Sequence, residues 1–134
     1  MKDRHMFRGK DVNGEWYTGL LSESLGWCGS PEKGYYISND NYKPWAYQVR
    51  PETVGQCTGL KDKNGKLIYE GDVVKITPDP ESKNIHETHD VYFDEELCEF
   101  GFHMTMLPLW GQLKDEYVII GNIHDNPELP KEAK

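Results

Sequence analysis

Short runs of alternating apolar and polar residues, separated by Asn-Gly, Gly-rich and Pro-rich turns, dominate the sequence and predict a mainly β protein. The run Tyr117–Ile120 is apolar on both faces, which predicts the most buried strand. No stretch of ten or more residues keeps an apolar spacing of 3.6, so little helix is expected. The remaining strands are expected at residues 16–21, 35–38, 45–49, 73–76, 90–94 and 99–104.

The stretch Glu52–Ile76 contains the strongest turn signals. Asp62 followed by Asn64 and Gly65 predicts a β-hairpin, because Gly65 can adopt a left-handed conformation without steric cost. A three-residue loop is favoured, since it places Asp62 opposite Lys66, and such oppositely charged cross-strand pairs stabilise a hairpin. A second turn at Gly71 leads into a short apolar strand, an arrangement that suits a small, curved barrel.

A further Asn-Gly pair at residues 13–14 predicts a first hairpin near the N-terminus. Residues 22–34 are rich in Ser, Gly and Pro and hold Trp27 and Cys28, so they are expected to form a surface loop, where function often lies. Residues 39–44 are expected to form a turn, and the two prolines of residues 77–84 predict another loop. Asn126 is expected to cap a single helical turn, and residues 129–134 are expected to fray.

The central block TVGQCTGLKDKNGKLIYEGDVVKI resembles the signature of the YopX family of phage and prophage proteins. FRGKDVNGEW at residues 7–16 and IIGNIHDNPEL at residues 119–129 match the same family in the same order. The resemblance implies one β-rich domain over residues 1–128, with an N-terminal β lobe (1–50) and an SH3-like small barrel (51–128). The resemblance does not by itself imply any enzymatic activity. Cys57 stands where the family is expected to have an aromatic residue, and we interpret it as a semi-buried strand position.

Composition narrows the classes of function. The 134 residues carry a net charge of -8, which repels phosphate backbones and makes nucleic acid an unlikely partner. No stretch approaches the roughly 20 apolar residues of a membrane span. Three cysteines at irregular spacing favour a reducing compartment. These features predict a protein of the cytoplasm, here that of a bacterial host.

One cluster has the residue types of a metal site. His86, His89 and Asp90 are imidazole and carboxylate groups that suit zinc or nickel, with His103 as a further ligand candidate. The cluster follows a Pro-rich loop, where histidines are usually solvated, and no cysteine lies at ligand spacing. We therefore expect no bound metal and no cofactor.

Two other arrangements offer catalytic chemistry. The carboxylates of residues 90, 94, 95, 96 and 99 could divide into a general acid and a general base, but strand alternation places them on the solvent side or in a turn. A nucleophilic pair of Cys57 or Cys98 with His103 is compatible with the spacing, although nothing in the local sequence supports it. The sequence thus predicts no catalytic residues.

The sequence predicts a non-enzymatic protein that acts by binding another phage or host protein or by self-assembly. Uncharged aromatic strands supply the interface candidates Tyr36, Trp45 and Tyr47, and covering them by a second copy predicts a homo-oligomer. One alternative is a metal-dependent enzyme built on the histidine cluster. Another is a nucleic-acid-associated small barrel, for which Lys61, Lys63, Lys66 and Lys75 would supply a basic face.

Overall fold

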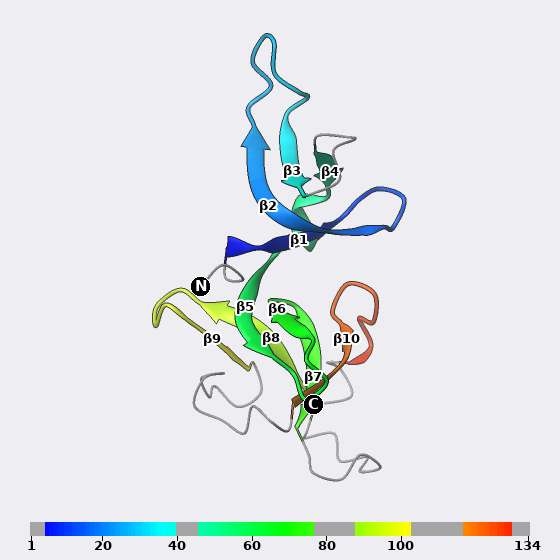
Figure 1. Cartoon of the computed structure of the whole chain (residues 1–134), viewed down its shortest axis with the longest axis vertical. Coiled ribbons are helices and arrows are strands. Elements are labelled where there is room, and N and C mark those ends of the chain that lie inside the picture. Colours follow the sequence, from blue (N-terminus) through cyan, green and yellow to red (C-terminus); the bar gives the residue numbers. More distant parts are fainter. Residues whose placement is uncertain (1–4, 40–45, 77–87, 103–116, 130–134) are drawn as a thin grey trace. The chain divides into compact units, whose positions relative to one another are not determined.

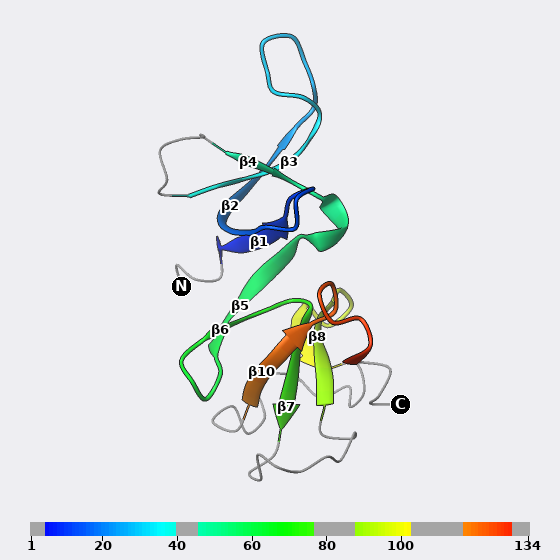
Figure 2. The same ribbon diagram turned by 90° about the vertical axis from the view of Figure 1, so that its right-hand side faces the viewer.

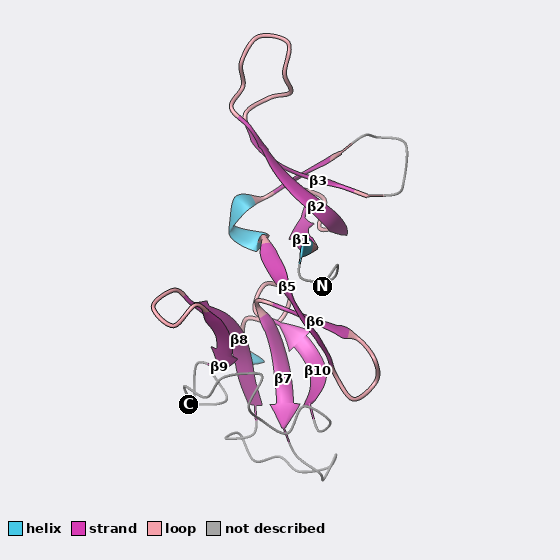
Figure 3. Cartoon of the chain, turned by 60° about the vertical axis from the view of Figure 1, so that its left-hand side comes forward, coloured by secondary structure: helices cyan, strands magenta, loops and turns pink. Residues whose placement is uncertain are grey.

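The computed structural model of the chain describes residues 5–39, 46–76, 88–102 and 117–129. Ten strands, β1 to β10, supply most of the regular structure in these ranges, and helical conformation is limited to short turns such as the 3₁₀ turn Pro51–Thr53 (Figure 3). The predicted fold class, mainly β with little helix, is confirmed. No helix within the described ranges is long and apolar enough to cross a membrane.

The chain divides into two compact units, Met1–Cys57 and Thr58–Lys134, called here the N-terminal and the C-terminal unit. Strand β5 (Gly55–Lys61) contains the boundary, so its first residues belong to one unit and its last residues to the other. The prediction of one domain with lobes 1–50 and 51–128 stays a prediction, and the SH3-like barrel is not confirmed.

The N-terminal unit is an antiparallel sheet with the strand order β4-β3-β2-β1-β5 (Figure 1). Strands β2 and β3 continue together into a long hairpin, and the turn between β1 and β2 holds the Asn-Gly pair. The strand bounds are β1 (Phe7–Lys10), β2 (Trp16–Ser24), β3 (Gly34–Ser38) and β4 (Tyr47–Val49).

In this sheet the backbone of Gly9 lies close to a side chain of another strand. Ile37, Val49 and Cys57 are among its buried apolar side chains, and a Cβ atom at Gly9 would lie 2.7 Å from the Val49 side chain. Only glycine fits there without displacing Val49. On the same sheet the rings of Tyr17 and Tyr47 stack with centroids 3.9 Å apart, which fixes β4 against the first hairpin.

The C-terminal unit combines the β5–β6 hairpin with a four-stranded antiparallel sheet in the order β10-β7-β8-β9. Figure 2 shows β10, β7 and β8 side by side, and Figure 3 also labels β9. Ile68, Val74 and Val91 form its buried core. Leu60, Phe100 and Ile119 pack around this core and are partly buried. The bounds are β6 (Leu67–Tyr69), β7 (Asp72–Ile76), β8 (Thr88–Asp94), β9 (Glu99–Phe102) and β10 (Tyr117–Asn122).

The prediction that Tyr117–Ile120 is the most buried strand is wrong. Ile120 in β10 is 41% exposed, whereas Val73 and Val74 in β7 are fully buried. The reason is position in the sheet: β10 is the end strand of the order, while β7 lies between β10 and β8. A central strand has neighbours on both sides, which a short apolar run in the sequence does not reveal.

Two further expectations need correction. The segment 22–34 is not all loop, because Ser22 to Ser24 pair with Tyr36 to Gly34 and extend β2, which leaves residues 25–33 as the loop. Ser22 and Ser24 pair with β3 although serine has a weak preference for strands. Pairing with a neighbouring strand outweighs that preference. Cys57 is fully buried rather than semi-buried.

Candidate functional site

The predicted turn between β5 and β6 is confirmed in its three-residue register. The Asp62 N–H donates to the Lys66 carbonyl oxygen (2.8 Å) and the Gly65 N–H donates to the Asp62 carbonyl oxygen (3.0 Å). Gly65 has a φ of 82°, the left-handed conformation that glycine adopts without strain. Lys61, Lys63 and Lys66 are exposed around this turn.

The carboxylate of Asp62 joins this turn to the far end of the chain. Its Oδ1 accepts the N–H groups of Asn64 and Lys66, each at 2.9 Å, and its Oδ2 accepts the N–H of Ile119 in β10 at 3.1 Å. Asp62 is only 6% exposed. Three backbone donors therefore compensate for the burial of this charge, and the role of Asp62 is structural.

The first hairpin repeats the same Asp-x-Asn-Gly device. Oδ1 of Asp11 accepts the N–H groups of Asn13 and Glu15, each at 2.9 Å, and Oδ2 accepts the Tyr17 hydroxyl at 3.3 Å. The hydrogen bond from the Glu15 N–H is the main cause of the lowered pKa of Asp11. Loss of hydration, followed by the negative charge of Asp11, raises the pKa of Tyr17.

Gly71 has a φ of 93° and lies where three strands meet. Its N–H donates to the Val91 carbonyl oxygen in β8 (2.8 Å), and its own carbonyl oxygen accepts the Ile123 N–H (2.9 Å). Beside it, Oδ2 of the buried Asp72 accepts the Tyr69 N–H at 2.7 Å. This turn therefore links β6 and β7 to β8 and to the residue that follows β10.

The structure describes two of the four candidate metal ligands. His86 and His103 lie outside the described residues, whereas His89 and Asp90 are buried in β8, with 5% and 9% exposed. Successive strand residues point to opposite faces, so His89 and Asp90 do not converge. Among the residues that the structure describes, no group of three His, Cys, Asp or Glu side chains is placed to hold a metal ion.

The expectation that Asp90 faces solvent is wrong, because β8 lies between β7 and β9 and Asp90 is covered. The other carboxylates of the β8–β9 hairpin are in or beside its turn. Glu95 and Glu96 are exposed, and Oδ1 of Asp94 caps the turn by accepting the N–H groups of Glu96 (3.0 Å) and Leu97 (3.2 Å).

Of the three interface candidates, the structure describes Tyr36 and Tyr47, and only Tyr36 lines a surface pocket. Trp45 lies outside the described residues, and Tyr47 is stacked on Tyr17. Tyr36 lies on β3, where its hydroxyl donates to the Glu32 carbonyl oxygen at 2.7 Å. Its ring contributes to the wall of a pocket that the sequence did not predict.

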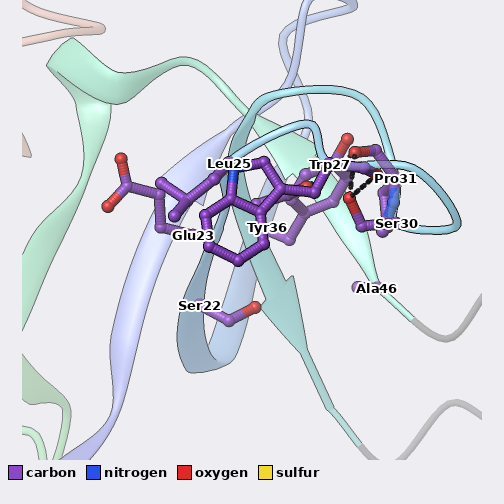
Figure 4. Close-up of a pocket in the computed structure, with 9 residues that line it drawn as sticks. Ser22, Glu23, Leu25, Trp27, Ser30, Pro31, Tyr36 and Ala46 are labelled. Atoms are coloured by element: carbon purple, nitrogen blue, oxygen red, sulfur yellow. Dashed lines mark hydrogen bonds between the residues drawn. The ribbon is translucent and has the colours of Figure 1, made fainter.

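This pocket lies where the β2–β3 hairpin meets its loop (Figure 4). It has a volume of about 310 Å³. Trp27 is 73% exposed and Leu25 is 54% exposed, so two large apolar side chains on this loop face solvent. The lining residues are Ser22, Glu23, Ser24, Leu25, Trp27, Ser30, Pro31, Tyr36 and Ala46.

One hydrogen bond across the loop and two local ones hold the loop around this pocket. The Ser24 hydroxyl donates to the Pro31 carbonyl oxygen at 2.6 Å, and the Gly26 N–H donates to the Ser24 hydroxyl at 3.2 Å. The Ser30 N–H donates to the Trp27 carbonyl oxygen at 2.9 Å. Trp27 therefore lies on a loop whose backbone is held by these hydrogen bonds.

Sequence reasoning identified the loop as a place for function but did not single out Trp27. A tryptophan among Ser, Gly and Pro residues was the available signal, since such a loop offers few core positions to bury an indole. The pocket itself could not be found from the sequence, because Tyr36 and Ala46 join it only through the pairing of β3 with β2 and β4.

Comparisons with known proteins agree with this fold. The chain is similar to a crystal structure of protein EF1440 from Enterococcus faecalis, with 26% sequence identity and a TM-score of 0.55. The similarity covers 92% of this chain and 96% of that one. No protein with a curated description matches the sequence significantly. The sequence model of the YopX protein family matches residues 7–131, and because this is nearly the whole chain, the protein belongs to the YopX family.

Proposed function

We propose that this YopX protein is encoded by a phage or prophage and acts without catalysis, by binding another protein in the cytoplasm of the bacterial host. One observation carries the proposal: Trp27, 73% exposed on a hydrogen-bonded loop, stands over a pocket of about 310 Å³. Exposed aromatic side chains on a braced loop are typical of residues that dominate the energy of protein interfaces.

The chemistry of the pocket supports binding over catalysis. Trp27, Leu25, Pro31 and Tyr36 present rings and aliphatic carbons, which bury well against a partner. The free thiols of Cys28 and Cys98 are exposed, which suits a reducing cytoplasm and supports the proposed location.

The test compares capture of host proteins by tagged wild-type chain and by the Trp27→Ala variant, with mild cross-linking in the host cell. A partner retained by wild type and lost by at least about tenfold with Trp27→Ala supports the proposal, since interface hot spots contribute 2 kcal/mol or more. Leu20→Ala is the matched control, because Leu20 is 58% exposed on the same hairpin and does not line the pocket. Equal capture by all three proteins would refute the proposal.

A further inference from the structure

The groups that the Trp27 pocket offers to a ligand are fewer than its lining suggests. The hydroxyl protons of Ser24 and Tyr36 are donated to carbonyl oxygens of the loop itself, those of Pro31 and Glu32. The Ser30 hydroxyl likewise donates to the Trp27 carbonyl oxygen. These three hydroxyl groups hold the loop, so apart from the Ser22 hydroxyl the uncharged side chains offer a ligand mainly aromatic faces and aliphatic carbons.

Glu23 is the exception, because it is the one charged residue in the lining. Its side chain is exposed, and no lysine or arginine in the described ranges forms an ion pair with it. Figure 4 shows its carboxylate at one end of the pocket, beyond the indole of Trp27. The pocket therefore combines an open indole face with a carboxylate that pairs with no cation in the described part of the chain.

This combination selects a ligand group with a flat cationic head and an apolar stem. A guanidinium group stacks on an indole face, donates in a fork to a carboxylate, and carries three methylene groups that can lie on Leu25 and Pro31. We infer that the Trp27 pocket binds an arginine side chain of the protein partner, with the guanidinium between Trp27 and Glu23. This inference rests on the proposed function.

Charge complementarity favours this occupant over the alternatives. The chain carries a net charge of -8, which attracts a cationic segment and repels an acidic one. A lysine has the charge but lacks the planar group that stacks on a ring and bridges to a carboxylate. A purely apolar side chain would fill the pocket but gain no attraction from the Glu23 carboxylate.

The probe is a blocked peptide, acetyl-Gly-Ser-Arg-Ser-Gly-amide, titrated into the full chain labelled with ¹⁵N. The readout is the indole N–H resonance of Trp27, identified among the four tryptophans by its loss in Trp27→Phe. The matched probe carries citrulline, which has the shape of arginine without its charge. We expect the arginine peptide to shift the Trp27 resonance and the citrulline peptide to bind at least about threefold more weakly.

The variant Glu23→Gln should reduce affinity for the arginine peptide by a similar factor and leave affinity for the citrulline peptide unchanged. Glu95→Gln, an exposed carboxylate in the β8–β9 turn, is the matched control and should bind as wild type does. Equal binding of the two peptides, equal loss in the two Gln variants, or no shift of Trp27 would each overturn the inference.

These outcomes separate this inference from the proposed function. Loss of capture with Trp27→Ala together with equal binding of both peptides keeps the partner-binding pocket and removes arginine as its occupant. Capture that does not depend on Trp27 removes the proposed function, whichever peptide binds.

Discussion

The two Asp-x-Asn-Gly turns provide an internal comparison of the same carboxylate in two environments. Asp11 and Asp62 each accept two backbone N–H bonds of 2.9 Å within their own turn. Asp62 differs because it is buried and accepts a third backbone bond, from Ile119 in β10. We predict that Asp62→Ala destabilises the protein more than Asp11→Ala does.

The magnitude follows from what each alanine leaves behind. At the exposed first turn, water can replace the carboxylate, so Asp11→Ala should have the smaller effect. Loss of the two turn hydrogen bonds of the buried Asp62 should cost about 1 kcal/mol, similar to the loss of a helix cap. At the second turn the Ile119 N–H is part-buried, and leaving such a donor unpaired costs about 1–3 kcal/mol more. Asp62→Ala should therefore cost about 2–4 kcal/mol.

Amide hydrogen exchange is the appropriate assay, because it reports opening residue by residue within each unit. In Asp62→Ala the amides of Lys66 and Ile119 should exchange faster by a factor that matches the lost stability. In Asp11→Ala the effect should be confined to the N-terminal unit. Asp62→Ala with a cost no larger than that of Asp11→Ala, or with unchanged protection at Ile119, would refute this account of the turn.

Four further predictions follow from the same structure. Gly65→Val forces a β-branched residue to a φ of 82° and should lower the free energy of unfolding by more than about 1 kcal/mol, whereas Gly65→Asn should be milder; an unchanged urea midpoint for Gly65→Val would contradict this. Hydrogen bonds hold the pKa of Asp11 below its ordinary 3.8, so its carboxylate stabilises the folded state above that pH. In acid unfolding curves, the extra stability of the wild type over Asp11→Asn should be lost as the pH falls through the lowered pKa. The N-terminal unit should mediate a dimer, since β4 is the end strand of its sheet in the described residues; a constant mass near 15.5 kDa in light scattering over a hundredfold concentration range would exclude it. Purified protein should contain no stoichiometric zinc, and elemental analysis that finds one zinc per chain would revive the site at His86, His89 and Asp90.

The sequence by itself determined the turns and most strands. Asp62 and Gly65 are enough to predict a three-residue hairpin loop, because the hydrogen bonds that define it join residues no more than four positions apart. The same holds for Asp11 and Gly14 in the first hairpin. Local chemistry of this kind is complete within a few residues and needs no tertiary context.

Tertiary structure alone decided which strands are central and which residues meet. Ile120 is exposed and Asp90 is buried because β10 ends its sheet and β8 lies inside it, an order that alternation along one strand does not encode. Asp62 meets the Ile119 N–H across 57 positions of sequence. The Trp27 pocket likewise needs Tyr36 from the neighbouring strand, so it exists only once β2 and β3 have paired.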